Sequence, residues 1–244
     1  MKLKVIGTGS RGNAYLLYNE QEALLIECGV VFKKIKEALN FDFSKVVGCI
    51  LTHEHGDHNK AIDDILKSLI KVYASEGTLR ATNHQNHHNA SIVRSKKMFK
   101  IGGFSIIPFD VKHDVNEPLG FLINHNDCGV TLFLTDTFYS PYRFKGLNNL
   151  IVEANFCEDI IEEKLKLDKA FLKNRILKSH LSIQKCIDLL RINDLSQVNN
   201  IVLIHLSDSN SNELEFKEKV HAVTGKTTFV ANDGLEIEFN KTPF

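Results

Sequence analysis

The run Thr52–His58, with the sequence THEHGDH, constrains this chain more than any other feature, and it follows an apolar stretch typical of a buried strand. Histidines this dense repel one another if charged, and each one that is buried needs a polar partner. Imidazole and carboxylate groups together are typical ligands of zinc and related divalent ions. The run therefore predicts a metal centre rather than a solvated polar loop. The predicted ligands in it are His53, His55, Asp57 and His58.

Three later residues, each at the end of an apolar strand-like run, extend this set. They are His113, Asp136 and His205. The loops that leave the ends of neighbouring strands gather at one edge of a sheet, so these side chains are expected to meet there. One such residue alone would be explained as a structural hydrogen-bonding group. Three in the same context favour further ligands, enough for two ions.

The remaining pattern predicts an α/β fold in a single domain, residues 1–244, without repeats or linkers. Short apolar runs predict strands at Leu3–Ile6, Ala14–Tyr18, Ala23–Glu27, Val46–Leu51, Lys71–Ala74, Phe104–Phe109, Leu119–Asn124, Val130–Leu134, Asn149–Glu153, Ile201–Ile204, Thr227–Val230 and Leu235–Phe239. Helical periodicity marks Val31–Leu39, Ala61–Ile70, Ser182–Ile192 and Asn212–Val220. Strand clusters and helices in both halves predict two sheets face to face with helices outside, a four-layer αββα sandwich.

Composition limits the partners and the compartment. The chain has 30 Lys and Arg residues against 30 Asp and Glu residues, and a protein that grips long nucleic acid usually carries a basic excess. Its five cysteines are scattered, which favours free thiols in a reducing compartment. It opens directly into a strand-like run and holds no apolar stretch long enough to span a membrane. We therefore expect a cytoplasmic protein.

Two segments allow more than one interpretation. Gly7–Gly12 matches G-x-G-x-x-G, but a dinucleotide site needs a helix at the third glycine, and Asn13–Tyr18 reads as a strand. We therefore expect a glycine-rich bend in a hairpin. Asn83–Ser95 is polar and holds three histidines, which predicts an exposed loop. A lid over the site or a dimer contact is the alternative.

The order H-x-H-x-D-H, then His, Asp and His, resembles the metallo-β-lactamase superfamily over nearly the whole chain. In true β-lactamases the position of Asp136 is typically Cys, so the resemblance points to the broader hydrolase branch. The family's early Leu-Ile-Asp is Leu25-Ile26-Glu27 here, so a glutamate replaces the aspartate that supports the metal loop. The resemblance implies two divalent metal ions, with Zn²⁺ expected and Mn²⁺ as the alternative.

The ligand sets also come from that resemblance. It implies that one ion is held by His53, His55 and His113. It implies that the second ion is held by Asp57, His58 and His205. Asp136 would bridge the two, and Asp57 and Asp136 would orient the nucleophile.

Three further stretches resemble the RNase Z-like and YycJ-like phosphodiesterase branch. They are Gly7–Asn13, Leu150–Asn155 and Ser179–Ser182. The resemblance implies that His180 contacts the phosphate or protonates the leaving oxygen, with support from Glu153. Catalytic roles thus fall to Asp57, His180 and Glu153, and substrate binding falls to His180 and Ser182. The alternatives are a helix cap for His180 and a surface ion pair for Glu153.

The absence of a tRNA-gripping arm and of a second nuclease domain, together with zero net charge, favours a small nucleotide over a long nucleic acid. In size the chain resembles phage anti-Pycsar proteins, which hydrolyse 3′,5′-cyclic mononucleotides to monophosphates and cancel an immune signal. That resemblance implies a homodimer. One alternative is a YycJ-like 5′-to-3′ exonuclease that acts on single strands. A glyoxalase II-like thioester hydrolase is another, and it would not need His180 or Glu153.

Overall fold

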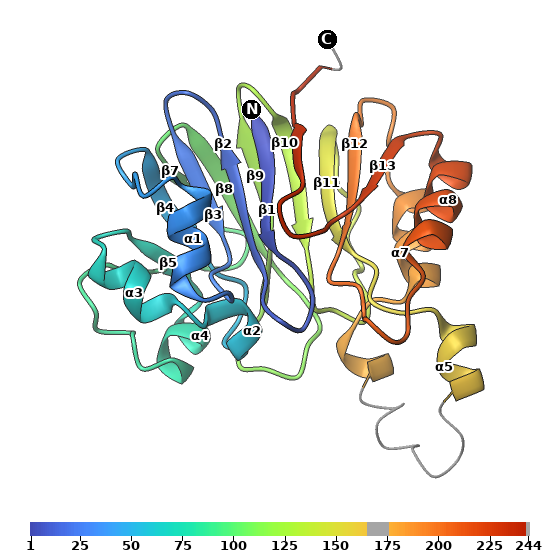
Figure 1. Cartoon of the computed structure of the whole chain (residues 1–244), viewed down its shortest axis with the longest axis horizontal. Helices are drawn as coiled ribbons and strands as arrows, with labels where there is room; N and C mark the ends of the chain where they lie inside the picture. Colours follow the sequence, from blue (N-terminus) through green and yellow to red (C-terminus); the bar gives the residue numbers. More distant parts are fainter. Residues whose placement is uncertain (165–175, 243–244) are drawn as a thin grey trace.

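Two seven-stranded sheets lie face to face in the computed structural model, which describes residues 1–164 and 176–242 (Figure 1). The first sheet has the order β14-β1-β2-β3-β4-β5-β6, with β1 (Lys2–Gly7), β2 (Ala14–Tyr18), β3 (Ala23–Ile26), β4 (Val46–Ile50), β5 (Val72–Ala74), β6 (Ala90–Ile92) and β14 (Glu236–Glu238). The second has the order β13-β12-β11-β10-β9-β8-β7, with β7 (Phe99–Ile101), β8 (Phe104–Asp110), β9 (Leu119–His125), β10 (Gly129–Leu134), β11 (Leu147–Glu153), β12 (Asn200–Ile204) and β13 (Thr227–Val230).

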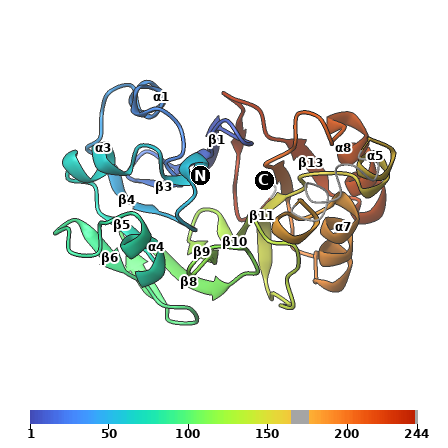
Figure 2. The same ribbon diagram turned by 90° about the horizontal axis from the view of Figure 1, so that it is seen from below.

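Helices cover the outer face of each sheet, as the two views at right angles show (Figures 1 and 2). The first sheet carries α1 (Phe32–Ala38), α2 (Gly56–Asn59), α3 (Ile62–Lys67) and α4 (Glu76–Ala81). The second carries α5 (Glu158–Lys164), α7 (Ile183–Ile192) and α8 (Glu213–Thr224). The predicted four-layer sandwich is therefore confirmed. No helix in the described part of the chain is long and apolar enough to cross a membrane.

Three apolar clusters hold the four layers together. The central cluster lies between the sheets and includes Tyr15, Phe104 and Phe133. Separate clusters lie between each sheet and its helices. Every residue of β11 is buried, because this strand pairs in parallel with β10 and β12 and is covered on both faces.

The predicted strands and long helices are confirmed, and the differences concern short elements. The predicted helix Ala61–Ile70 is shorter, as α3. The sequence pattern did not predict α2, α4, α5, β6 or β7, which have three to seven residues each. Such elements are too short to show a periodicity. The segment Asn83–Ser95, predicted as a loop, contains β6, the edge strand of the first sheet.

The topology gathers the candidate ligands at one edge of the sandwich. Strands β3 and β4 are parallel, and so are β10, β11 and β12. Their carboxyl ends lead into the residues singled out above. In Figure 1 this edge, marked by α2, lies at the bottom, opposite both chain termini.

Candidate metal centre

The loop after β4 carries four of the candidate ligands into the protein interior. His53 and His58 are buried, and His55 and Asp57 are half-buried at the rim. Helix α2 begins one residue after His55, so Asp57 and His58 occupy its single turn. The His58 ring, which this turn carries, lies with its centroid 4.2 Å from that of His53.

The candidate ligand atoms from all these loops lie close together. The separations are 3.1 Å between His55 Nδ1 and His113 Nε2, 3.4 Å between His53 Nε2 and Asp136 Oδ2, 3.2 Å between His58 Nε2 and Asp136 Oδ2, and 3.5 Å between His205 Nε2 and Asp57 Oδ2. Three groups that could hold an ion result. They are His53, His55, His113 and Asp136; Asp57, His58 and His205; and Asp136, Glu153, His180 and His205, which shares one residue with each of the other two.

These separations fit divalent metal ions. Nitrogen or oxygen ligands 2.0–2.1 Å from a tetrahedral ion are about 3.3 Å from one another. The Nε2 atom of His53 is buried and has no hydrogen-bond partner among the described residues. An unpartnered buried nitrogen is costly, and a cation removes that cost. The donor set and its spacing therefore suit a divalent metal site.

Three residues in the left-handed region turn the chain at this edge. Glu27 follows β3 with φ 63°, Asp136 lies just beyond β10 with φ 46°, and His205 follows β12 with φ 55°. Residues other than glycine adopt this region at an energetic cost, which the surrounding contacts must offset. All three side chains are directed into the same cluster. The backbone strain at these three residues therefore lies at the candidate metal centre.

The glycine-rich bend between β1 and β2 supports both halves of the centre. The hydroxyl of Thr8 accepts a hydrogen bond from the His205 amide at 3.0 Å, and the Asn13 side chain donates to the Asp57 carbonyl at 3.2 Å. A Cβ at Gly12 would lie 2.2 Å from the carbonyl oxygen of Gly29. No side chain fits there. The predicted hairpin is confirmed, and it serves as a brace for the metal loops.

Contacts outside the cluster fix the orientation of the imidazole rings. The Thr52 hydroxyl lies 2.9 Å from His53 Nδ1, and the Ser179 carbonyl lies 3.1 Å from His113 Nδ1. Each ring therefore turns its Nε2 atom toward the cluster. Such outer contacts set the tautomer and the basicity of a metal-binding histidine.

Glu27 makes the corresponding outer contact with the His58 ring. Its buried carboxylate lies 3.5 Å from His58 Nδ1 and accepts a hydrogen bond from the Thr52 amide at 3.3 Å. The glutamate that stands where the family has aspartate thus reaches the metal loop. The sequence showed that glutamate replaces the family's aspartate at this position, but only the fold shows that the longer side chain contacts His58.

Replacing Glu27 with glutamine is expected to weaken metal binding about 10- to 100-fold, because the neutral amide no longer orients and polarises the His58 ring. Competition with a chromogenic chelator measures this affinity. Glu22→Gln is the matched control, since Glu22 lies 3.0 Å from His125 Nε2 in the β2–β3 turn, remote from the cluster. Equal affinities for the Glu27→Gln protein and the wild type would show that Glu27 has no such role.

Glu153 and His180 form a second pair beside the cluster. The buried Glu153 carboxylate lies 2.8 Å from His180 Nδ1 and accepts hydrogen bonds from the amides of Leu181 and Thr137. The His180 ring is 24% exposed. Since Nδ1 faces Glu153, the Nε2 atom points away from it and has no hydrogen-bond partner among the described residues. The surface ion pair considered for Glu153 is wrong, because this carboxylate is fully buried.

The charges in the cluster are strongly coupled. Burial lowers the pKa of His53 well below its usual value, with a further contribution from His58, and burial lowers the pKa of His113. Both rings are therefore neutral and offer lone pairs. Burial alone would raise the pKa of Asp136, but His205 and His58 hold it well below its usual value. Glu153 outweighs the effect of burial on His180 and raises its pKa to about 9.

A cavity of about 450 Å³ opens onto this cluster. Among the predicted residues it is lined by His55, Asp57, His113, Asp136, His180 and His205. His53, His58 and Glu153 lie behind them. Ser182 is not brought to the cavity: its buried hydroxyl accepts from the Lys185 amide, as the N-cap of α7, and donates to Glu158. Asn155, Ser207 and Asn210 also line the cavity, and of these Asn210 lies outside every stretch that the sequence singled out.

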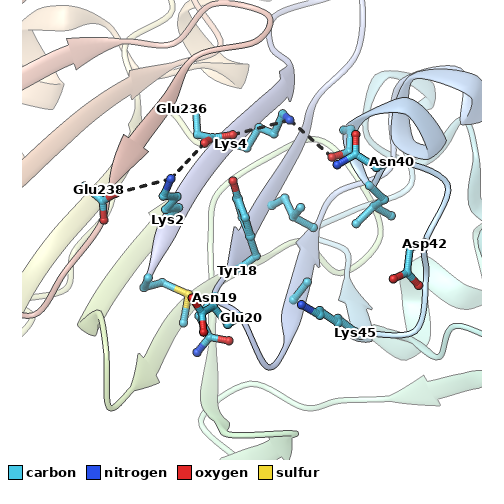
Figure 3. Close-up of a pocket in the computed structure, with 15 residues that line it drawn as sticks. Lys2, Lys4, Tyr18, Asn19, Glu20, Asn40, Asp42, Lys45, Glu236 and Glu238 are labelled. Carbon is cyan, nitrogen blue, oxygen red and sulfur yellow. Dashed lines mark hydrogen bonds and ion pairs between the residues drawn. The ribbon is translucent and has the colours of Figure 1, made fainter.

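A larger cavity, about 730 Å³, lies on the outer face of β1 and β2 (Figure 3). Four of its charged side chains, Lys2, Lys4, Glu236 and Glu238, pair with one another. Lys2 lies 3.5 Å from Glu236, and Lys4 lies 3.6 Å from the same carboxylate. None of the candidate metal-binding groups includes a residue from this cavity. Despite its size, it is therefore not the reactive site of the described structure.

Comparison with known proteins agrees with this geometry. The family model of the beta-lactamase superfamily domain matches residues 24–206. An exodeoxyribonuclease of Streptococcus pneumoniae, WalJ, is 26% identical over 98% of this chain and 92% of its own length. An exodeoxyribonuclease of Bacillus anthracis, YycJ, is 28% identical over 97% of this chain and 94% of its own. The metallo-β-lactamase fold protein YhfI of Bacillus subtilis superimposes with a TM-score of 0.74 at 17% identity, over 97% of this chain and 99% of that one.

These relatives contradict the prediction of a small nucleotide substrate in place of a long nucleic acid. Both full-length relatives are named for action on DNA. The prediction depended on a net charge of zero, which averages over the surface and does not report where the charges lie. The homodimer was implied by the same resemblance to phage proteins and loses its support with it.

The fold, the cluster of histidines and carboxylates, and the match over most of the chain together assign it to a family. Metal-dependent hydrolysis is the activity that these relatives and this donor set support. The chain belongs to the metallo-β-lactamase superfamily.

Proposed function

We propose that this protein is a metal-dependent exodeoxyribonuclease that removes nucleotides from the end of a single DNA strand. The observation that carries the proposal is the His180–Glu153 pair, 2.8 Å apart, beside a cluster suited to two divalent ions. The names of the full-length relatives support DNA as the substrate. A thioester hydrolase would need the metal cluster but not this pair.

Under this proposal the cluster would hold two Zn²⁺ ions. His53, His55 and His113 would bind the first. Asp57, His58 and His205 would bind the second. Asp136 would be the ligand common to both, since its Oδ2 atom lies within 3.8 Å of nitrogen atoms of His53, His58 and His113. When bound, two divalent ions lower the pKa of water and neutralise charge on a phosphodiester.

The protein's own groups then complete the reaction. Asp57 and Asp136 orient the attacking water on one side of the phosphorus atom. As the bond from phosphorus to the departing sugar oxygen breaks, His180 donates the proton on Nε2 to that oxygen. Glu153 accepts a hydrogen bond from Nδ1 and holds the ring in this orientation, as a carboxylate does for a general-acid histidine. Water supplies the oxygen that the phosphate gains, so the products are a nucleotide and a shortened strand.

The polarity that we propose is 5′ to 3′, in line with the resemblance to the YycJ-like branch. The cavity of about 450 Å³ accommodates a strand end and its first nucleotide. The polarity is read from oligonucleotides labelled at either end.

The test uses the purified protein, Zn²⁺ or Mn²⁺, and a fluorescent single-stranded oligonucleotide, with a His53→Ala, His55→Ala double variant as the control. We expect the oligonucleotide to be degraded by the wild type only, and a chelator to stop the reaction. A thioester substrate is tested in parallel. Thioester hydrolysis with the oligonucleotide intact would replace this proposal by the glyoxalase II-like function.

A further inference from the structure

An exposed aromatic ring stands beside the candidate metal centre. Tyr139 is 54% exposed and lies three residues beyond Asp136. Three residues of extended chain span at most about 11 Å, so the Cα atom of Tyr139 lies within that distance of the Cα atom of Asp136. Among the described residues, the only other aromatic side chain of comparable exposure is Phe41, in the turn after α1.

The turn that carries Tyr139 is held firmly against the centre. The Thr137 hydroxyl accepts a hydrogen bond from the Lys112 amide at 3.0 Å and donates to the Tyr139 carbonyl at 2.9 Å. The Thr137 amide donates to Glu153 at 3.3 Å, and the Phe138 amide donates to the Lys112 carbonyl at 3.2 Å. The turn is thus tied to the partner of His180 and to the residue before His113. Such a turn presents its side chains in one orientation.

Cationic residues lie near this turn, in space or along the chain. The Lys185 ammonium group lies 5.8 Å from the centre of the half-buried Phe138 ring. Lys112 and Arg143 are exposed. None of these three forms an ion pair within the described ranges, 1–164 and 176–242. The nearby carboxylate of Asp114 accepts a hydrogen bond from the Ser179 hydroxyl and lies 3.4 Å from His113.

Aromatic rings interleaved with unpaired cations are the features by which proteins bind single-stranded nucleic acid. Each base has a face that stacks on an aromatic ring, and the cations attract the phosphates. Duplex DNA keeps its bases stacked on one another, so it offers no free face to such a ring. The combination therefore favours an unpaired strand over a duplex, although the net charge of the whole chain is zero.

We infer that Tyr139 stacks on a base of single-stranded DNA next to the scissile phosphodiester, with Lys112, Lys185 and Arg143 contacting the flanking phosphates. This inference depends on the proposed nuclease function and names the surface that selects an unpaired strand. The surface defined by Tyr139, Lys112, Lys185 and Arg143 is the strand-binding surface.

The test measures binding alone, so cleavage of the strand does not affect the result. The metal-loaded protein is titrated into a fluorescent single strand with phosphorothioate linkages, which resist hydrolysis, and anisotropy gives the Kd. Tyr139→Ala is expected to weaken binding about tenfold. Tyr139→Phe, which keeps the ring, is expected to bind within about twofold of the wild type. Phe41→Ala is the matched control for the loss of an exposed aromatic ring, and it should leave the Kd unchanged.

A series of strands, each with one abasic nucleotide, identifies the stacked base. At one position the abasic change should weaken binding of the wild type about tenfold and leave binding of Tyr139→Ala unaffected. Unchanged binding by Tyr139→Ala would overturn the inference, as would abasic effects that are the same in both proteins. If the strand binds in this way but an ordinary strand is never cut, the nuclease proposal fails alone. If the strand is cut but Tyr139→Ala binds normally, the inference fails alone.

Discussion

Replacing Asp136 with alanine is expected to lower kcat/KM for DNA hydrolysis by at least about a thousandfold. Its two oxygens reach both halves of the cluster. The Oδ2 atom lies 3.2 Å from His58 and 3.4 Å from His53, and the Oδ1 atom lies 2.6 Å from His205. Removing the side chain takes away the shared ligand and leaves the buried imidazoles without a counter-charge. Activity and bound metal should therefore be lost together.

Metal content by mass spectrometry and activity on a labelled strand are measured on the same preparation. Asp136→Asn keeps the volume of the side chain and separates loss of charge from collapse of the loop. Asp127→Ala is the control, because Asp127 contacts Asn19 in a surface turn and lies outside every candidate metal group. An Asp136→Ala protein that keeps two ions and normal activity would exclude Asp136 as the bridging ligand.

Replacing His180 with alanine is expected to reduce kcat about 10²- to 10⁴-fold while both ions stay bound, because the variant lacks the group that protonates the departing oxygen. The ring is 24% exposed and contacts Glu153, so its loss leaves His53, His55 and His113 in place. The readout is kcat together with metal content.

A substrate with a p-nitrophenolate leaving group distinguishes protonation from positioning. Such a leaving group departs without a proton, so the defect of His180→Ala should largely disappear with it. His125→Ala is the matched control, since His125 also pairs with a glutamate, Glu22, but lies outside the candidate centre. Loss of the ions from His180→Ala would identify His180 as a ligand. An equal defect with both substrates would assign it a positioning role.

The candidate metal ligands could be predicted because each one is a histidine or an aspartate that follows an apolar run in the sequence. Several histidines and aspartates follow apolar strands in this chain, and β4, β10 and β12 each show a plain apolar run. The four-layer architecture follows from the same runs, because sheets that are apolar on both faces need two further layers to cover them.

The supporting residues could not be predicted in the same way, since their roles depend on tertiary contacts. Nothing local in the sequence shows that the Thr8 hydroxyl holds the His205 amide, 197 residues away. Ser182 is the opposite case. Its position beside His180 suggested substrate binding, whereas the fold uses its hydroxyl to cap α7. A polar residue directly before a helix commonly accepts a hydrogen bond from a backbone amide in the first turn of that helix.

The substrate prediction was wrong because it depended on the total numbers of acidic and basic residues in the chain. A chain with equal numbers of acids and bases can still present a local cationic surface, because acids elsewhere in the chain balance the three cations near Tyr139 in the total. Only the fold shows which charges share a surface.

One measurement tests the central claim most directly. A linear single-stranded DNA and a closed circle of the same sequence are incubated with the metal-loaded protein, and the products are resolved by length. An exonuclease needs a strand end, so the account predicts that the linear strand is reduced to mononucleotides and that the circle stays intact. Cutting of the circle, or an intact linear strand with both ions bound, would contradict the account.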